Sequence, residues 1–209
     1  MTDRRAGRHQ ATRRELIAAA WVLARRKGLT GWTLRELAAA VGMRAPSLYV
    51  YFDGKSSIYD AMYAEGYDAL LAAAEGLDRT RAPLEVLRLA AHGFVDFAVA
   101  DPARLQLMFL RVIPDFEPSQ ASYARAVRVL GLIAELLADA GLAGSRPLDL
   151  WTATLTGLAT QQVSNDPGGT RWTRLVDDVV DMLVASQWQP AGENPVERRP
   201  VQEPEENLK

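Results

Sequence analysis

Residues 33–62 read TLRELAAAVGMRAPSLYVYFDGKSSIYDAM, and this stretch decides the fold expected at the start of the chain. Thr33 and Glu36 have the T-x-x-E spacing of a capping box, which predicts that a short helix begins just after Thr33. Gly42 ends this helix, because glycine readily adopts the left-handed conformation that a tight turn needs. The pattern therefore predicts a helix of two turns followed by a sharp corner.

A second short helix is predicted over residues 45–52. Pro46 falls in its first turn, where a missing N–H group costs nothing. Leu48 and Phe52 are four residues apart and point toward the same core. The other side chains of this segment are left on or near its outward faces: Arg44, Ala45, Ser47, Tyr49 and Tyr51.

A longer helix is expected before this pair, over residues 12–27. Thr12 and Glu15 have capping-box spacing, and Gly28 suits the position just after a helix. Three helices joined by two turns are what a helix-turn-helix DNA-binding unit requires, with the two-helix motif at residues 33–52. The alternative is a plain corner between helices with two partly buried tyrosines, and topology alone does not separate the two interpretations.

The charge is divided unequally along the chain. Residues 1–55 hold 11 Lys and Arg against 4 Asp and Glu, whereas residues 56–209 hold 13 against 22. The net charge of −2 thus conceals a basic segment of +7 and an acidic remainder of −9. A basic segment favours a polyanion, because each phosphate that it neutralises releases condensed counterions. The alternative is a solvated charged face, which charge alone does not exclude.

The composition argues against several kinds of site. The chain has no cysteine and only His9 and His92, so we expect no metal site and no cofactor. The motifs G-x-S-x-G and H-E-x-x-H are absent, and we expect no enzyme. There is no run of about 18 apolar residues and no leader-like segment after the charged N-terminus, so we expect a cytoplasmic protein without a membrane partner.

The rest of the chain has helical periodicity and no alternating strand pattern, which predicts an all-α protein of about nine helices. Prolines and glycines place the boundaries between its segments. Further helices are expected over residues 56–77, 83–100, 102–111, 119–140, 148–166 and 170–188. The Pro-rich and Glu-rich tail at residues 189–209 is expected to be disordered.

The last two predicted helices carry apolar stripes that are broad for one small core, which favours a dimer interface. The alternative is a stripe that packs within one chain, and periodicity alone does not exclude it. The predicted interface residues are Trp151, Leu155, Leu158, Gln162, Leu175, Val176, Val179, Val180 and Leu183.

Large apolar side chains in the second part of the chain are candidates for the lining of a ligand cavity, although such side chains more often form plain core. The predicted lining residues are Tyr63, Tyr67, Phe94, Phe97, Met108, Phe109, Tyr123 and Trp151. His92 is expected to be a hydrogen-bonded core or surface side chain rather than a ligand contact, because a single imidazole identifies no chemistry.

The stretch from residue 33 onward resembles the N-terminal domain of the tetracycline-repressor (TetR) family of bacterial transcription regulators. The resemblance is strong over about 65 residues, and its specificity comes from many positions in fixed order. The positions that match are Thr33, Leu37, Ala38, Gly42, Leu48, Tyr49, Tyr51, Phe52 and Lys55. Arg44 departs from the pattern, since the family often has a serine or threonine cap there.

The resemblance implies a DNA-binding domain at residues 10–55, in which residues 45–52 read bases and Thr33 and Lys55 contact phosphate. It implies a ligand-binding and dimerisation domain at residues 56–188 that pairs its last two helices with a second copy. The DNA-contacting residues expected on this basis are Thr33, Arg35, Arg44, Ala45, Pro46, Ser47, Tyr49, Tyr51 and Lys55.

The function expected is that of a repressor that binds a palindromic double-stranded DNA operator as a homodimer and is released by a small apolar or aromatic effector. The alternative is a helical small-molecule-binding or adaptor protein without DNA contact. The segment around Trp151 also loosely resembles a C-terminal subclass that has a tryptophan followed by histidine-glycine. Gly157 fits that subclass and Thr156, in place of the histidine, does not.

Overall fold

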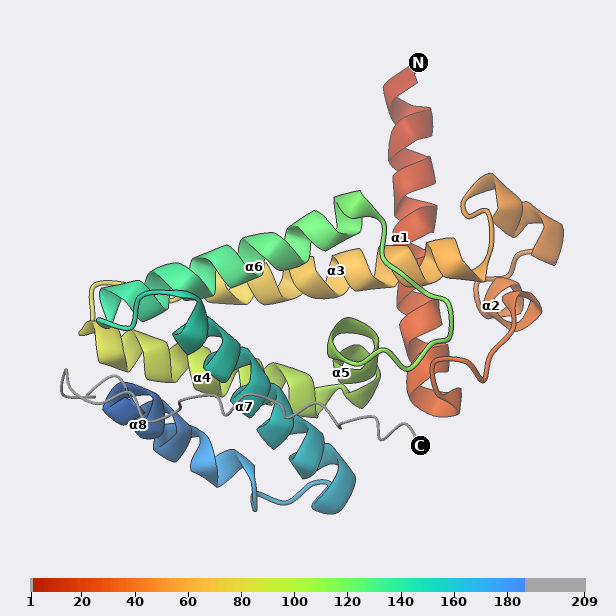
Figure 1. Cartoon of the computed structure of the whole chain (residues 1–209). Helices are drawn as coiled ribbons and strands as arrows, with labels where there is room; N and C mark the ends of the chain where they lie inside the picture. Colours follow the sequence, from red (N-terminus) through yellow and green to blue (C-terminus); the bar gives the residue numbers. More distant parts are fainter. Residues whose placement is uncertain (1, 187–209) are drawn as a thin grey trace, which may run out of the picture.

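The computed structural model describes residues 2–186, and all regular elements in that range are helical (Figure 1). The all-α class is therefore confirmed, with eight α-helices and two short 3₁₀ segments among the described residues. The tail predicted at residues 189–209 lies outside them. The elements are α1 (Thr2–Lys27), α2 (Leu34–Ala40), η1 (Ala45–Val50), α3 (Lys55–Glu75), α4 (Pro83–Ala100), α5 (Pro102–Phe109), α6 (Gln120–Asp139), α7 (Ser145–Asn165), η2 (Thr173–Leu175) and α8 (Val176–Ser186).

Helix α1 ends at Lys27 as predicted, but it begins at Thr2 and not at Thr12. The capping box predicted at Thr12 is therefore wrong. The preceding turns contain few apolar residues, and none of the side chains described over residues 6–15 is buried, whereas Leu16 is. Hydrophobic periodicity could not reveal these turns, because it depends on apolar side chains that recur on one face.

The corner between α2 and η1 has the predicted form. The Thr33 Oγ1 accepts from the Glu36 amide at 3.2 Å, and the Glu36 carboxylate accepts from the Thr33 amide at 2.9 Å. This reciprocal capping box satisfies two amide groups that the first turn of α2 leaves free. Gly42 has a φ of +69°, which an L side chain rarely adopts and which explains the glycine at this turn.

The second helix of the motif is shorter and tighter than predicted. It is a 3₁₀ segment over Ala45–Val50 and not an α-helix over residues 45–52. Pro46 lies in its first turn, and the Tyr51 amide donates to the Leu48 carbonyl at 2.8 Å, three residues back. Leu48 and Phe52 are both buried as predicted, so the tighter winding keeps the same inward face.

The core of the first three helical elements continues into α3, so the two parts of the molecule share one apolar cluster. Trp21, Trp32, Leu37 and Leu48 meet Ile58 from the first turn of α3. Burying one large apolar side chain stabilises the fold by about 1.5–3 kcal/mol relative to leaving that side chain exposed. Helix α1 crosses the beginning of α3, which then runs on into the larger part of the molecule (Figure 1).

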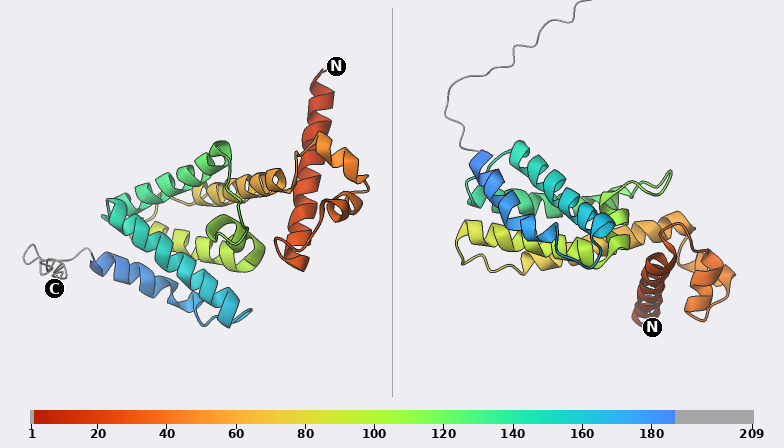
Figure 2. Two further views of the ribbon diagram at one scale, coloured as in Figure 1. Left: turned by 45° about the vertical axis from the view of Figure 1, so that its right-hand side comes forward. Right: turned by 90° about the horizontal axis from the view of Figure 1, so that it is seen from below.

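The larger part consists of α3 to α8. Helices α3 and α6 run side by side, and α4 packs against α7 and α8 (Figures 1 and 2). The short α5 lies between α3, α4, α7 and α1 and contacts all four. The bounds predicted for α4 agree with the structure, because Pro83 and Asp101-Pro102 mark both ends. No helix among the described residues is long and apolar enough to cross a membrane.

Candidate DNA-binding surface and helical cavity

The outward face of η1 is open to solvent. Arg44, Pro46 and Ser47 are exposed, and the Tyr49 side chain is 61% exposed. Val50 was not among the predicted DNA-contacting residues, yet its side chain is 68% exposed, more than that of Tyr49. Two adjacent exposed apolar side chains, Tyr49 and Val50, lie beside the exposed Arg44 and Ser47, which makes this face a candidate interaction surface.

Two further predicted residues, Thr33 and Arg35, lie exposed at the start of α2. The Thr33 hydroxyl is engaged in the capping box, and Glu36 also forms an ion pair with Lys27. Hydrogen bonds from Lys27 and Thr33 lower the pKa of Glu36 from 4.5 to about 2. The first turn of α2 is thus held in a fixed position beside η1, while the Arg35 side chain remains free to extend.

Tyr51 is only half-buried, and two residues of α1 hold it in place. Arg13 donates from Nη1 to the Tyr51 carbonyl at 2.6 Å, and its guanidinium lies 4.3 Å from the centre of the Phe52 ring. The His9 ring stacks on the Tyr51 ring with centroids 4.7 Å apart. Sequence reasoning missed both contacts. His9 lies before the start predicted for α1 at Thr12, and the Arg13 hydrogen bond joins residues far apart in the sequence, which no local pattern shows.

Lys55 begins α3, and its ammonium group is turned toward the loop before α2. It donates to the carbonyls of Thr30 and Trp32 at 3.0 and 2.6 Å and lies 4.4 Å from the centre of the Trp32 ring. Desolvation lowers the pKa of Lys55. The side chain predicted to contact phosphate therefore first joins α3 to that loop, with one N–H left for another acceptor.

A cavity of about 140 Å³ lies in the larger part of the molecule, between α3, α4, α6 and α7. Four of the eight predicted lining residues border it: Tyr67, Phe94, Phe109 and Trp151. No charged side chain lines it, and the Thr152, Thr156 and Tyr67 hydroxyls supply its polar edge. This chemistry suits an uncharged apolar molecule with one hydrogen-bonding group.

The rings of Tyr67 and Phe109 form one wall of the cavity and touch edge to face, with centroids 5.8 Å apart. The Tyr67 hydroxyl donates to the Met108 carbonyl at 3.2 Å, near the end of α5. Burial raises the pKa of Tyr67, so its hydroxyl keeps its proton and remains a donor. Tyr67 of α3 is therefore attached to α5 twice, by the hydrogen bond from its hydroxyl to Met108 and by the contact of its ring with Phe109.

A second, more open hollow of about 410 Å³ lies on the other side of Phe109. Tyr63, Met108 and Tyr123 line it, and the exposed Arg111 and Glu117 form an ion pair at its edge. Phe97 borders neither space. It packs instead near the Arg104 guanidinium, 5.5 Å from its ring centre. The predicted lining residues thus divide between two hollows, and Phe97 belongs to the packing between helices.

The comparison with family models accounts for most of the chain. Residues 16–62 match the model of "Bacterial regulatory proteins, tetR family", and residues 87–187 match the "Tetracyclin repressor-like, C-terminal domain". The chain belongs to the TetR family. The first match contains the capping box, the glycine corner and η1, so the resemblance predicted from these residues is confirmed.

Two curated relatives match part of the TetR-family chain. It is 28% identical over 102 residues to the uncharacterized HTH-type transcriptional regulator YobS of Bacillus subtilis (strain 168), covering 48% of this chain and 53% of YobS. It is 36% identical over 89 residues to the HTH-type transcriptional repressor KstR2 of Rhodococcus jostii (strain RHA1), covering 40% and 43%. The chain spans about half the length of the curated relatives it matches.

Solved structures share the fold over most of their length. The putative regulatory protein SCO4313 has a TM-score of 0.73 at 19% identity, covering 86% of this chain and 98% of that one. The transcriptional regulator FadR from Bacillus subtilis, solved in complex with stearoyl-CoA, has a TM-score of 0.63 at 17% identity, covering 81% and 96%. At identities of 19% and 17%, these comparisons show a shared fold and nothing further.

The predicted dimer residues require a correction, because most of them are core residues of a single chain. Their stripes pack α7 and α8 against α4 and against each other, as the open alternative held. A side chain without accessible surface cannot contact a second copy. The members without accessible surface are Leu155, Gln162, Val176 and Val180. Trp151 and Leu183 are nearly as buried, whereas Leu158, Leu175 and Val179 are half-buried.

Gln162 illustrates the correction. Its Oε1 accepts from the amides of Trp172 and Thr173 at 2.9 and 3.3 Å, and its Nε2 donates to the Asp166 carbonyl. It fastens the turn between α7 and η2 from inside. A buried glutamine on an apolar stripe must have hydrogen-bond partners. The sequence does not show whether these partners belong to the same chain or to a second copy.

Small residues in the sequence could have indicated the cavity. Its size depends on small residues on facing helices, including Ala73 and Ala74 of α3 and Ala90 and Gly93 of α4. Large side chains occur in all cores, whereas adjacent small residues on two packed helices leave space between them. His92, beside Gly93, is half-exposed and lies 3.2 Å from Asp177, so its assignment as a hydrogen-bonded surface residue is confirmed.

Proposed function

We propose that this TetR-family protein is a transcriptional repressor that binds operator DNA as a homodimer and is released by a compact apolar effector. The observation that carries the DNA-binding part is the exposed face of η1, formed by Arg44, Ser47, Tyr49 and Val50 on a segment of charge +7. The division into residues 10–55 for DNA and 56–188 for effector and partner follows from this assignment.

The chemistry of that face suits the major groove. Arg44 can donate in bidentate fashion to guanine or to phosphate, and Ser47 and Tyr49 can donate to phosphate oxygens. Val50 offers an apolar contact for a thymine methyl group. Arg35 and the amides of the first turn of α3, beside Lys55, can donate to phosphate oxygens on either side of η1.

The dimer interface that we propose lies on the outward faces of α7 and α8 and not on their buried stripes. Leu175 at the end of η2 is followed at helical spacing by Val179 and Met182 of α8, and the Met182 side chain is 68% exposed. On α7, Gly157 is exposed beside the half-buried Leu158 and permits close approach of another helix. A two-fold contact through this surface gives two η1 segments, as a palindromic operator requires.

The size and polarity of the cavity determine the proposed effector class. A cavity of about 150 Å³ lined by Leu, Ile and Phe binds benzene, and the present one of about 140 Å³ is similar in both respects. A charged molecule would have to leave its hydration without a compensating partner in this lining. We therefore assign a neutral ring-sized molecule, held by contacts with Phe94, Phe109 and Trp151 and oriented by the Thr156 hydroxyl.

Selection of DNA fragments by the purified protein at two salt concentrations tests the DNA-binding part. We expect a palindrome whose affinity falls steeply with salt, because several phosphate contacts release counterions together. Recovery of nothing above random DNA at both concentrations would contradict it and favour the alternative of a helical binding protein without DNA contact.

The effector class is tested by thermal shift and operator release with benzene, indole and stearoyl-CoA as probes. Benzene or indole is expected to raise Tm and to weaken operator binding. The variant Gly93→Leu should abolish the Tm shift, because Gly93 lies at the exposed rim of the cavity and a Cβ atom there meets nothing within 4 Å, so a leucine has room to block the opening. A response to stearoyl-CoA alone, unaffected by this variant, would assign the effector to the second hollow instead.

A further inference from the structure

Helix α5 touches the cavity with one end and the DNA-binding part with the other. It has 8 residues, Pro102–Phe109, and is therefore about 12 Å long. Its last residue, Phe109, lines the cavity, and its first turn contacts α1. Because an α-helix this short is stiff along its axis, a displacement at one end reaches the other.

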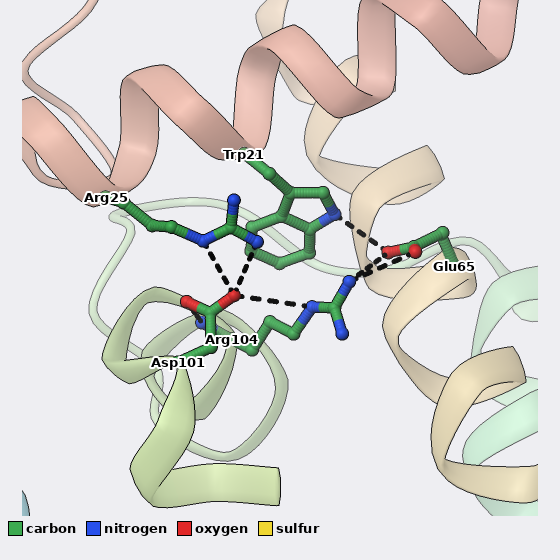
Figure 3. A network of polar contacts seen from close by, with 5 residues as sticks. All are labelled: Trp21, Arg25, Glu65, Asp101 and Arg104. Carbon is green, nitrogen blue, oxygen red and sulfur yellow. Dashed lines mark hydrogen bonds and ion pairs between the residues drawn. The ribbon is translucent and has the colours of Figure 1, made fainter. Parts of the chain in front are cut away.

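The N-terminal end of α5 is bound to α1 by an ion pair (Figure 3). Arg25 of α1 donates from Nε and Nη2 to Asp101 Oδ2 at 2.9 and 2.7 Å. Asp101 is only 8% exposed, and its Oδ1 also accepts from the Arg104 amide at 3.3 Å, which caps α5. One carboxylate thus fixes the start of α5 and the end of α1 to each other.

A second contact joins the same elements through α3. The Trp21 indole of α1 donates to Glu65 of α3 at 2.8 Å, and Arg104 of α5 donates to both Glu65 oxygens at 3.1 and 3.3 Å (Figure 3). Arg104 Nε also lies 3.5 Å from Asp101 Oδ2. The five side chains of this hinge network, Trp21, Arg25, Glu65, Asp101 and Arg104, are thus linked across α1, α3 and α5 (Figure 3).

The C-terminal end of α5 is bound to the wall of the cavity. Tyr67 donates to the Met108 carbonyl, and Phe109 packs against both Tyr67 and Phe94. Met108 lies directly over Gly66, where a Cβ atom would be 2.5 Å from its sulfur. Gly66 follows Glu65 of the hinge network, so α3 and α5 approach closely between the cavity and α1.

We propose that α5 and the hinge network transmit effector binding to the DNA-binding part, and that Arg25 and Trp21 are the positioning residues through which α1 receives it. This inference rests on the proposed function and adds the route by which the cavity controls DNA. An effector that displaces Phe109 or Tyr67 moves α5, and Asp101 and Arg104 then move α1 through Arg25 and Trp21. The orientation of η1 changes with α1, because Arg13 joins α1 to Tyr51.

Arg25→Gln separates this role from a merely structural one. The Arg25 side chain is 44% exposed and pairs with Asp101 alone, whereas Asp101 keeps Arg104 and its capping contact in the variant. The change therefore removes the direct ion pair between α1 and α5 without removing the cap of α5, and it leaves the indirect link through Glu65 and Trp21 in place. Arg26→Gln is the matched control, since Arg26 is exposed on the same turn and has no ion pair within residues 2–186.

The experiment uses the full chain and the operator that it selects. Gly93→Leu, which adds a side chain at the rim of the cavity next to Phe94, is the stand-in for a bound effector. The measured quantity is the factor by which Gly93→Leu raises the operator Kd. We expect about 5–150-fold in the otherwise unchanged chain and in Arg26→Gln, as for typical coupled sites. In Arg25→Gln we expect a smaller factor, and in Arg25→Gln combined with Trp21→Phe about twofold or less, because uncoupled sites act independently to within roughly that factor. Trp21→Phe, which keeps the ring and loses the donor, should reduce the factor in the same direction.

The proposed route is contradicted if Gly93→Leu changes the operator Kd by the same factor in the otherwise unchanged chain and in Arg25→Gln. The absence of any change in both chains contradicts it too. A second readout needs no DNA. Gly93→Leu is expected to alter hydrogen exchange of the amides of residues 20–27, and equal alteration in the Arg25→Gln background contradicts the proposal. Failure of the proposed function shows differently, as absence of a selected operator in the unmodified chain.

Discussion

Arg13 and Tyr51 are joined by a hydrogen bond of 2.6 Å from the guanidinium to the backbone carbonyl, at the point where η1 ends. The contact ties the C-terminal end of the candidate DNA-reading segment to α1, the longest of the described helices. A 3₁₀ segment of 6 residues has few internal hydrogen bonds of its own, so its orientation depends on such external contacts.

The first prediction concerns this contact. Arg13→Ala should weaken operator binding by about 1 kcal/mol, roughly fivefold, because η1 loses a fixed orientation along with one hydrogen bond. The measurement is operator Kd by titration at constant salt. Arg14→Ala removes the same charge from the adjacent exposed position, where no partner occurs within the described residues, and separates the loss of orientation from the loss of charge. Equal effects of both variants would contradict the positioning role of Arg13.

The second prediction concerns Arg44, at the start of η1. Arg44→Ala should weaken operator binding by about 1–3 kcal/mol. If Arg44 contacts a base, discrimination at one operator position should relax, and if it contacts phosphate, the salt slope should fall by about one unit. Arg146→Ala, on the exposed start of α7, is the control and should leave Kd unchanged. An unaltered Kd in Arg44→Ala would remove this residue from the DNA-binding surface.

Most of the helices could be predicted from local signals. The bounds of α4 follow from Pro83 and Pro102, and those of α2 from a capping box and Gly42, since these residues act on their own backbone. The start of α1 could not be predicted in this way, because the contact described there, of His9 with Tyr51, joins residues far apart in the sequence. The tight winding of η1 likewise depends on packing that the pattern of Leu48 and Phe52 does not specify.

The candidate site was predictable in kind but only partly in detail. An exposed face on η1 follows from which residues of the segment are apolar. The division between core and interface on α7 and α8 does not, since a stripe that packs on α4 and a stripe that packs on a second copy have the same periodicity. The direction of the Lys55 ammonium group depends on the carbonyls of Thr30 and Trp32, which only the folded loop brings near.

The third prediction is a pH dependence that arises from Glu36. Its pKa is lowered in the folded state to about 2, chiefly by Lys27, so its contribution to stability is present above the unfolded value of 4.5 and is lost as pH falls from there toward 2. The Tm difference between the unchanged chain and Glu36→Gln should therefore be largest above pH 5 and vanish near pH 2. In a Lys27→Gln background the difference should shrink at neutral pH. A difference that does not vary with pH would contradict this account.

The fourth prediction separates the buried stripe of α7 from an interface. Gln162→Leu should lower the free energy of unfolding by about 1–3 kcal/mol, because the amides of Trp172 and Thr173 lose their acceptor in a partly buried turn. Denaturant titration measures the loss, and Gln161→Leu on the exposed side of the same helix is the control. Because Gln162 has no accessible surface, its replacement should leave the dissociation constant of the dimer unchanged once folding is complete.

The fifth prediction places the dimer contact on the outward face of α8. Met182→Lys should convert the dimer to monomers in sedimentation, because two Met182 side chains that pack near a two-fold axis would become two adjacent cations. Unfolding of the monomer should be little affected, since Met182 is exposed in a single chain. Asp178→Lys, which also changes an exposed position of α8, tests whether any added cation has the same effect. Monomers in the unchanged chain, or dimers that tolerate Met182→Lys, would move the interface elsewhere and leave the spacing of the two η1 segments to a different pair of helices.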